Sequence, residues 1–353
     1  IQYHQVFCEN SKSQYGEYDI CDFYMVGDGR DLVANSVRIE GDLKVCNTGN
    51  TRATNQHVQF NPNVGIHGIC EAVSVEFENV GVVQRLNEYA RLVHMGQMAT
   101  KDRNDLLNTL DQVELKSPDV RYSQQYCYGI TDPNDTNTIV RDVDFSFMPE
   151  ICVNKMAGGN LSMDKTGYIK VTLNLARDVA FLYGRDVDQN YNYQIRNLRL
   201  TYKSVPAQGE GKVQMRSSVM IKNSVLTSFS NTSAKVPAVC DACSISFLQQ
   251  NKENTFLNDN LACETMPKVT ELQFLFNDTS AYIRYVINDK ADMIRKYLES
   301  IESGSTNQVN ADKWKSNNNS ILTKFITPDK SLLGTVSVSN FDFDDAELGV
   351  YST

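Results

Sequence analysis

Apolar and polar residues alternate along several short segments of the chain. In "AVSVEFENV", Val73, Val75 and Phe77 point to one side, and Ser74 and Glu76 point to the other. A period of two is the signature of a β-strand with one face buried. The same pattern predicts strands over residues 35–45, 167–176, 191–205, 212–221, 271–277 and 334–341.

The segment 191–205 departs from strict alternation at one point. Its apolar phase slips between Ile195 and Leu198. A single extra residue in one strand of an antiparallel pair produces such a slip, so we expect a β-bulge there.

Helical periodicity is rare and predicts two short helices. The first covers 87–98, and the second covers 291–301. Each follows a pair of predicted strands, and we expect each to cover apolar surface at an open end or edge of a β module. The side chains expected to face inward are Leu86, Tyr89, Val93, Met293, Tyr297 and Leu298.

The strand–turn–strand–helix order therefore occurs twice and suggests two related β modules. Only about 50 residues follow the second helix, which is short for a second complete eight-stranded roll. We therefore expect the later module to be partial or the domains to be interleaved.

Many short strands, long polar connections and few helices predict a mainly β fold. We expect an antiparallel jelly-roll sandwich with a second, smaller β domain and a few short helices. The predicted division is an N-terminal arm (1–30), a jelly-roll domain (31–205) and a second β domain with one helix (206–353). A discontinuous jelly roll with an inserted upper domain is the alternative.

Composition and charge exclude some functions. The chain has 353 residues, of which 41% are hydrophobic and 22% charged, and its net charge is −9. It contains no block of Lys or Arg, so no nucleic-acid binding is expected. No run of about 18 apolar residues predicts a transmembrane segment.

The residues that usually carry chemistry are few and scattered. None of the four histidines, His4, His57, His67 and His94, has a common zinc-ligand spacing. His67 and His94 are expected to be packed or solvated imidazoles. The segment "GEGK" (209–212) lacks the remainder of a phosphate-binding loop and predicts a turn. We expect no catalytic, cofactor-binding or metal-binding residue, no cofactor and no enzymatic activity.

Nine cysteines are spread along the chain, mostly singly. This usage is typical of a reducing compartment with mostly buried thiols. Cys240 and Cys243 form the pair "CDAC", but "SISFLQ" behind them predicts a strand, so structural thiols are expected. The acidic segment "NFDFDDAE" (340–347) lacks calcium-loop spacing and predicts an exposed turn.

Several motifs resemble one family. They are "CVN" (152–154), the "SMDKTG" turn before an alternating strand, "FLYG" (181–184) and "YQIRNLRLTY". Together with "VVQRLNEYARLVHM" upstream and "CSISFLQQ" and "MIRKYLES" downstream, they resemble the penton (vertex) capsid proteins of virophages and polinton-like viruses. The resemblance spans about residues 36–350.

The resemblance implies a structural capsid protein that forms homopentamers at the five-fold vertices of an icosahedral shell. Its implied partners are further copies of itself and the neighbouring major capsid protein, with a minor capsid protein or host receptor as further candidates. The implied location is the virion, after assembly in the infected cell. The alternatives are a double-jelly-roll major or other minor capsid protein, or a β-sandwich attachment protein that binds a receptor or glycan.

Overall fold

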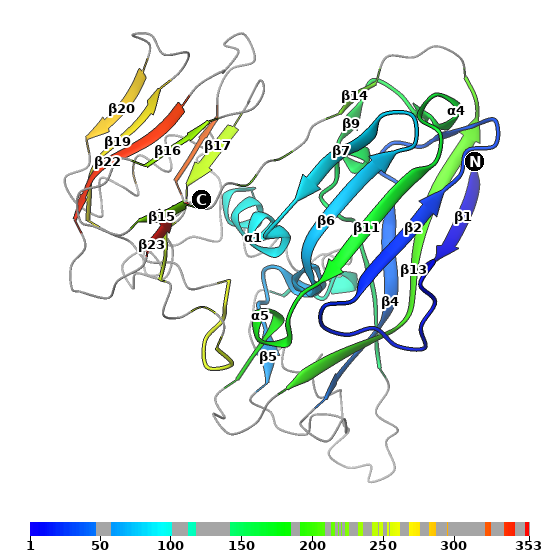
Figure 1. Cartoon of the computed structure of the whole chain (residues 1–353), viewed down its shortest axis with the longest axis horizontal. Helices are drawn as coiled ribbons and strands as arrows, with labels where there is room; N and C mark the ends of the chain where they lie inside the picture. Colours follow the sequence, from blue (N-terminus) through cyan, green and yellow to red (C-terminus); the bar gives the residue numbers. More distant parts are fainter. Residues whose placement is uncertain are drawn as a thin grey trace. The chain divides into compact units, whose positions relative to one another are not determined.

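The computed structural model describes residues 1–46, 58–100, 112–117, 142–184 and 191–208, and then short segments, mostly strands, as far as residue 352. The chain divides into two compact units (Figure 1). The first contains Ile1–His94, Asn104–Met220 and Asn254–Asp259, and the second contains Met95–Arg103, Ile221–Glu253 and Asn260–Thr353.

The first sheet of the first unit is built around one long strand. This strand is β13 (Asn192–Pro206), which pairs with β1 (Gln2–Phe7) and β4 (Arg38–Cys46). Thr201 of β13 lies opposite Gln5 of β1 and also opposite Arg38 of β4, so these two strands flank β13. The short β3 (Arg30–Leu32) pairs with β13 beyond β4, and β8 (Val143–Phe147) pairs with the other side of β4.

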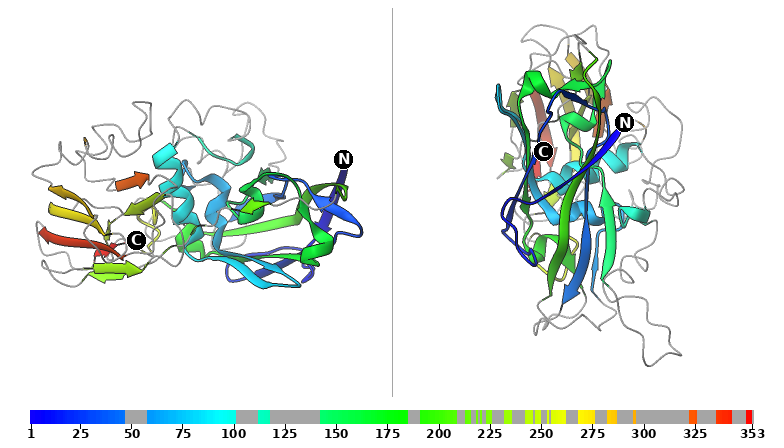
Figure 2. Two further views of the ribbon diagram at one scale, coloured as in Figure 1. Left: turned by 90° about the horizontal axis from the view of Figure 1, so that it is seen from above. Right: turned by 90° about the vertical axis from the view of Figure 1, so that its right-hand side faces the viewer.

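The second sheet of the same unit has four strands. Its order is β2 (Ile20–Met25), β11 (Ile169–Leu175), β6 (Cys70–Phe77) and β7 (Gly81–Leu86). Every pairing in both sheets is antiparallel. Figure 2 shows the two sheets of this unit as facing layers.

The order of the strands identifies the first unit as a jelly roll. We number the main strands one to eight along the chain and count β3 and β4 together as the third, because both pair with β13. The eight are β1, β2, β3/β4, β6, β7, β8, β11 and β13. One sheet then has the order 1-8-3-6 and the other 2-7-4-5. This arrangement is an eight-stranded jelly roll formed from two Greek keys. The predicted mainly β, antiparallel jelly-roll fold is confirmed.

Residues 1–30 are part of the roll, so the expectation of an N-terminal arm is wrong. They contain its first two strands, β1 and β2. The β2 strand does alternate, because Cys21, Phe23 and Met25 are buried between less buried residues. The β1 strand shows no apolar alternation because most of its residues are exposed. The division at residue 206 stays a prediction, although residues 206–220 belong to the first compact unit.

The core of the first unit lies between its two sheets. In β11, the alternate residues Ile169, Val171, Leu173 and Leu175 are at most 1% exposed. Fully burying a side chain of this type contributes about 1.5–3 kcal/mol. The alternation that predicted the strands therefore also gives the faces on which they pack.

The predicted bulge lies in β13. Arg196 is opposite Asp42, whereas Arg199 is opposite Glu40, so two residues of β13 face the single residue Gly41 of β4. The extra backbone is accommodated by Asn197, whose φ is +51°. This is the left-handed region that Asn tolerates better than most residues.

The first predicted helix is present as α1 (Tyr89–Thr100). Leu86 at the end of β7 and Tyr89 and Val93 of the helix are at most 2% exposed, which confirms that these three side chains face inward. The second predicted helix lies outside the described residues apart from Arg295, which is helical, so Met293, Tyr297 and Leu298 cannot be assigned.

Short elements connect the strands of the first unit. These are β5 (Gln59–Phe60), η1 (Gly65–Ile69), η3 (Cys152–Asn154), β9 (Met156–Ala157), β10 (Leu161–Ser162), α4 (Met163–Thr166), α5 (Asp178–Phe181), β12 (Leu182–Tyr183) and β14 (Gln214–Met215). Within the described residues, the strand predicted over 212–221 is limited to β14, which pairs with β9.

The second unit contains nine short strands in the described part of the chain. They are β15 (Asn223–Val225), β16 (Thr232–Lys235), β17 (Ala242–Ile245), β18 (Phe247–Gln249), β19 (Lys268–Leu275), β20 (Tyr282–Val286), β21 (Leu322–Phe325), β22 (Thr335–Asp342) and β23 (Val350–Ser352). They confirm the strands predicted at 271–277 and 334–341 and the strand behind the "CDAC" pair.

The strand pairing in the second unit repeats that of the first. One sheet has the order β16-β22-β19-β20, β23 pairs with β15 and β18, and β17 pairs with β21. Because β17 and β18 are one residue apart, we count them together as the third strand. The two sheets then have the orders 2-7-4-5 and 1-8-3-6, as in the first unit.

Candidate functional site

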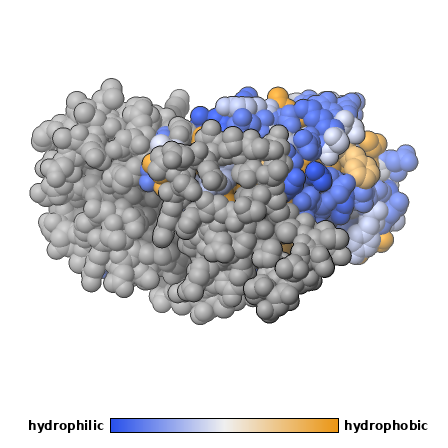
Figure 3. Space-filling view, turned by 90° about the horizontal axis from the view of Figure 1, so that it is seen from below, coloured by the Kyte–Doolittle hydropathy of each residue, from blue (hydrophilic) through white to orange (hydrophobic). Residues whose placement is uncertain are grey.

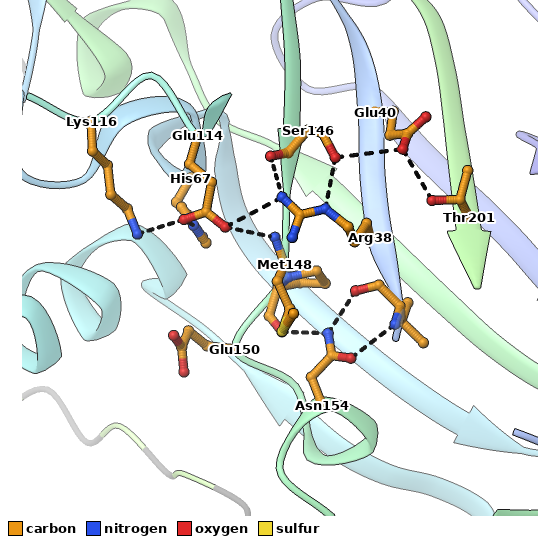
Figure 4. A network of polar contacts seen from close by, with 12 residues as sticks. Arg38, Glu40, His67, Glu114, Lys116, Ser146, Met148, Glu150, Asn154 and Thr201 are labelled. Carbon is orange, nitrogen blue, oxygen red and sulfur yellow. Dashed lines mark hydrogen bonds and ion pairs between the residues drawn. The ribbon is translucent and has the colours of Figure 1, made fainter. Parts of the chain in front are cut away.

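A buried cluster of charged side chains surrounds Glu114 in the first unit (Figure 4). Its carboxylate accepts hydrogen bonds from the Lys116 ammonium at 2.7 Å, from the His67 ring at 3.1 Å and from the Met148 backbone at 3.0 Å. Lys116 and His67 donate to Oε2 of Glu114, and the Arg38 guanidinium lies 3.7 Å from Oε1, the oxygen that accepts from Met148. These groups come from η1, β4, the residues after β8 and the segment 112–117.

The hydrogen bonds fix the proton positions at His67. The Tyr89 hydroxyl accepts the Glu150 backbone N–H at 2.9 Å and lies 2.9 Å from the Nδ1 of His67. The Glu114 carboxylate can only accept, so the proton of the neutral ring is assigned to Nε2, and Nδ1 accepts from the Tyr89 hydroxyl. Burial and the neighbouring Lys116 charge lower the pKa of His67, so the imidazole is neutral near pH 7.

Glu114 carries the negative charge of the cluster. Burial favours its neutral acid, but the hydrogen bond from His67 and the charge of Lys116 hold its pKa well below the usual range. Lys116 is 2% exposed and His67 1% exposed. Removing either partner of such a buried ion pair destabilises the protein, because the remaining charge is buried without compensation.

Arg38 connects this cluster to the face of the first sheet. Its guanidinium donates to the Ser146 hydroxyl at 2.7 Å and to the Ser146 carbonyl at 2.6 Å. Glu40, two residues along β4, accepts from Arg199 at 3.0 Å and from Thr201 at 3.2 Å. A row of polar contacts therefore crosses β8, β4 and β13.

Asn154 holds a neighbouring loop against β4. Its side-chain oxygen accepts from the Val37 backbone N–H at 3.1 Å, and its amide donates to the carbonyls of Val37 and Pro149, each at 2.9 Å. The Gln84 side chain accepts from the Cys152 N–H at 2.7 Å. The "CVN" motif thus fixes the loop after β8 to two strands.

These contacts indicate a structural role for the cluster. Glu114, His67, Lys116 and Tyr89 are buried, and hydrogen bonds link them to one another. No group of three or more His, Cys, Asp or Glu side chains is placed to hold a metal ion in the described residues. No helix in the described part of the chain is long and apolar enough to cross a membrane.

Of this cluster, only His67 and Tyr89 stand out in the sequence. His67 was expected to be packed or solvated, and the structure shows it packed. His94 is also buried, and the ring of His4 is 2.7 Å from the Ser204 hydroxyl. His57, Cys240 and the segment 209–212 lie outside the described residues. Glu114, Lys116 and Arg38 carry no local sequence signal, because only the fold brings their segments together.

Several apolar side chains of the first unit are exposed. Tyr3 and Phe7 of β1 are 75% and 61% exposed, and Val82 of β7 is 65% exposed. Both strands lie at the ends of their sheets among the described strands. Figure 3 shows a few groups of hydrophobic residues (orange) on the mostly hydrophilic (blue) surface of the described part. Exposed apolar residues on edge strands favour contacts with other protein chains.

Comparison with known proteins finds similarity only at the level of structure. No protein-family model and no curated protein matches the sequence. The mavirus major capsid protein is 10% identical, with a TM-score of 0.47, over 99% of this chain and 85% of that chain. A chain of the Sputnik virophage structure is 10% identical, with a TM-score of 0.48, over 99% and 84%. The major capsid protein of Sulfolobus turreted icosahedral virus is 7% identical, with a TM-score of 0.43, over 98% and 94%.

Proposed function

We propose that this chain is a structural capsid protein of a virus, built from two jelly rolls. The observation that carries the proposal is internal to the chain: the strand order 1-8-3-6 and 2-7-4-5 occurs once in each compact unit. Such rolls frequently form shells, because a rigid sandwich presents fixed flanks to its neighbours. The location that follows from this role is the virion.

Two rolls per chain favour a shell subunit that assembles in threes. A ring of three copies then contains six similar sandwiches, which gives a nearly hexagonal outline that tiles a shell. The exposed apolar residues of β1 and β7 are suited to the lateral contacts between copies. The partners we propose are further copies of this chain and other capsid proteins.

The vertex (penton) role stays a prediction that competes with this one. It expects five copies around a rotation axis, and a double roll was disfavoured because few residues follow the predicted second helix. That objection to a double roll no longer applies, since five of the eight strand positions of the second unit precede the helix. The motif resemblance to penton proteins still supports the vertex role.

Copy number separates these roles. The full chain would be purified under reducing conditions, and its mass measured by native mass spectrometry, with class averages from electron microscopy showing the symmetry. A three-fold particle is expected for a double-roll shell subunit, and a five-fold particle would instead support the vertex role. A chain that stays monomeric and binds cells or glycans would contradict both and favour an attachment protein.

A further inference from the structure

Two cysteines meet where the first two strands of the first roll pass from one sheet to the other. Cys8 directly follows β1, an end strand of the first sheet, and Cys21 is the second residue of β2, an end strand of the other (Figure 1). Both thiols are buried, with exposed fractions of 3% and 0%.

The backbone holds these cysteines side by side. The N–H of Glu9 donates to the carbonyl of Asp22 at 2.9 Å, so the residues that follow the two cysteines are bonded to each other. The two thiols are close enough to shift each other's pKa, which is lowered for Cys8 and raised for Cys21. A disulfide requires Cα atoms about 4.4–6.8 Å apart, and the backbone hydrogen bond beside the two cysteines brings their segments together.

The chain between the two cysteines begins with an exposed segment. Residues 9–14 are exposed, and Tyr15 is the buried anchor of this segment. The Tyr15 backbone exchanges hydrogen bonds with Ile195, each 2.8 Å long. Local opening of the segment before this anchor would admit a small oxidant while the sheets stay intact.

Cys8 differs from Cys21, Cys70 and Cys152 in the direction of its pKa shift. The hydrogen bond from Cys21 lowers the pKa of Cys8, whereas burial raises the pKa of Cys70 and Cys152. The thiolate is the nucleophile in thiol oxidation, so Cys8 is the member of the pair that reacts first.

We propose that Cys8 and Cys21 form a redox site that closes to a disulfide when the protein meets a peroxide. The Cys8 thiolate attacks hydrogen peroxide and, with one proton taken up, yields a sulfenic acid and water. The Cys21 sulfur then attacks the Cys8 sulfur, the S–O bond breaks, and the Cys21 proton leaves with the hydroxyl group as a second water. The two thiols lose two electrons in total, and the peroxide gains them.

The disulfide ties the first strand of one sheet to the first strand of the other. It closes a loop of about 14 residues, which restricts the unfolded chain. If the proposed capsid function holds, the site would stay reduced during assembly in a cell and close in particles exposed to oxidants outside. The chemistry of the pair does not depend on that function.

Peptide mapping tests the proposal directly. The full chain is treated with hydrogen peroxide, its remaining thiols are alkylated under denaturing conditions, and it is digested with trypsin without reduction. Trypsin cuts after Lys12, between the two cysteines, and after Arg30. The expected product is peptide 1–12 linked to peptide 13–30, which a reductant separates.

Matched variants identify the pair. Cys21→Ser should abolish the linked product, whereas Cys152→Ser, at another buried thiol, should leave it unchanged. The linked wild-type chain should also melt about 5–10 °C higher than the reduced chain. Recovery of Cys8 and Cys21 both alkylated after oxidation, or of Cys8 linked to a different cysteine, would overturn the proposal. Copy number measured under reducing conditions tests the capsid function separately.

Discussion

The two rolls share a strand order but differ in how long their strands are. In the first, β13 has 15 residues and β4 has 9, whereas the longest described strands of the second, β19 and β22, have 8 each. In both rolls the fourth and fifth strands form adjacent antiparallel partners, β6 with β7 and β19 with β20. The sheet order is therefore retained while the strand lengths vary, as expected if topology and not local detail defines the fold.

The comparison also explains why the second roll was underestimated. In the first roll, α1 follows the fifth strand, and only three main strands, β8, β11 and β13, come after it. The second roll likewise has three strands, β21, β22 and β23, after the predicted helix 291–301. About 50 residues are enough for three strands of mean length and their connections. The expectation of a partial second module is wrong, because five of its eight strand positions precede the predicted helix.

The largest expected effect comes from breaking the charged cluster, which tests whether the rolls unfold separately. Glu114→Ala leaves the buried Lys116 ammonium without its carboxylate, and we expect the first unit to lose about 3–5 kcal/mol. Hydrogen exchange measured at increasing denaturant concentrations should follow the two units separately. Amides of the first unit should lose protection at a lower denaturant concentration than in the wild type, and those of the second unit should be unchanged. Glu71→Ala, at an exposed position of β6, is the control, and a uniform shift of both units would contradict independent unfolding.

A backbone substitution beside this cluster is expected to have the next largest effect. Gly65 has a φ of +60°, and an added Cβ would lie 2.3 Å from the Glu114 carbonyl. Gly65→Ala should therefore cost about 2–4 kcal/mol, through steric overlap and backbone strain. The decrease in melting temperature on thermal unfolding measures this loss of stability. Gly96→Ala is the matched control, because no atom lies within 4 Å of its added Cβ; equal losses in both variants would contradict this account.

The bulge of β13 provides a smaller effect that sharpens the comparison of strand geometry. Asn197→Val places a β-branched residue at a positive φ, and we expect a loss of about 1–2 kcal/mol in the free energy of unfolding. Asn197→Gly should stay within about 0.5 kcal/mol of the wild type, because glycine adopts this conformation freely. Urea denaturation of the two variants distinguishes them, and similar losses would show that the bulge does not depend on this φ.

The smallest expected effect depends on pH. Burial raises the pKa of Asp178 to about 7, with a further contribution from the nearby Glu17. A carboxyl whose pKa is raised on folding binds its proton more tightly when folded, so it destabilises the fold at pH 8 and less so as the pH falls toward 4. Asp178→Asn should gain on the order of 1 kcal/mol at pH 8 and little at pH 4.

Melting temperatures of the wild type and Asp178→Asn between pH 4 and pH 8 test this. Asparagine keeps an oxygen that can accept the Tyr193 N–H, which Asp178 accepts at 3.1 Å. Glu78→Gln serves as a control carboxyl in the same unit. A gain for Asp178→Asn that is equal at both pH values would contradict the role of its charge.

The sequence alone determined several strands, one helix and the bulge, because these depend on the period of neighbouring side chains. Alternation located β4, β6, β11 and β22, and the slip between Ile195 and Leu198 located the bulge. Only the tertiary structure decided the strand pairing, which made residues 1–30 part of the first roll and showed a second roll. It also decided that Glu114 meets His67, and that Cys8 meets Cys21, since such contacts depend on how distant segments of the chain are brought together.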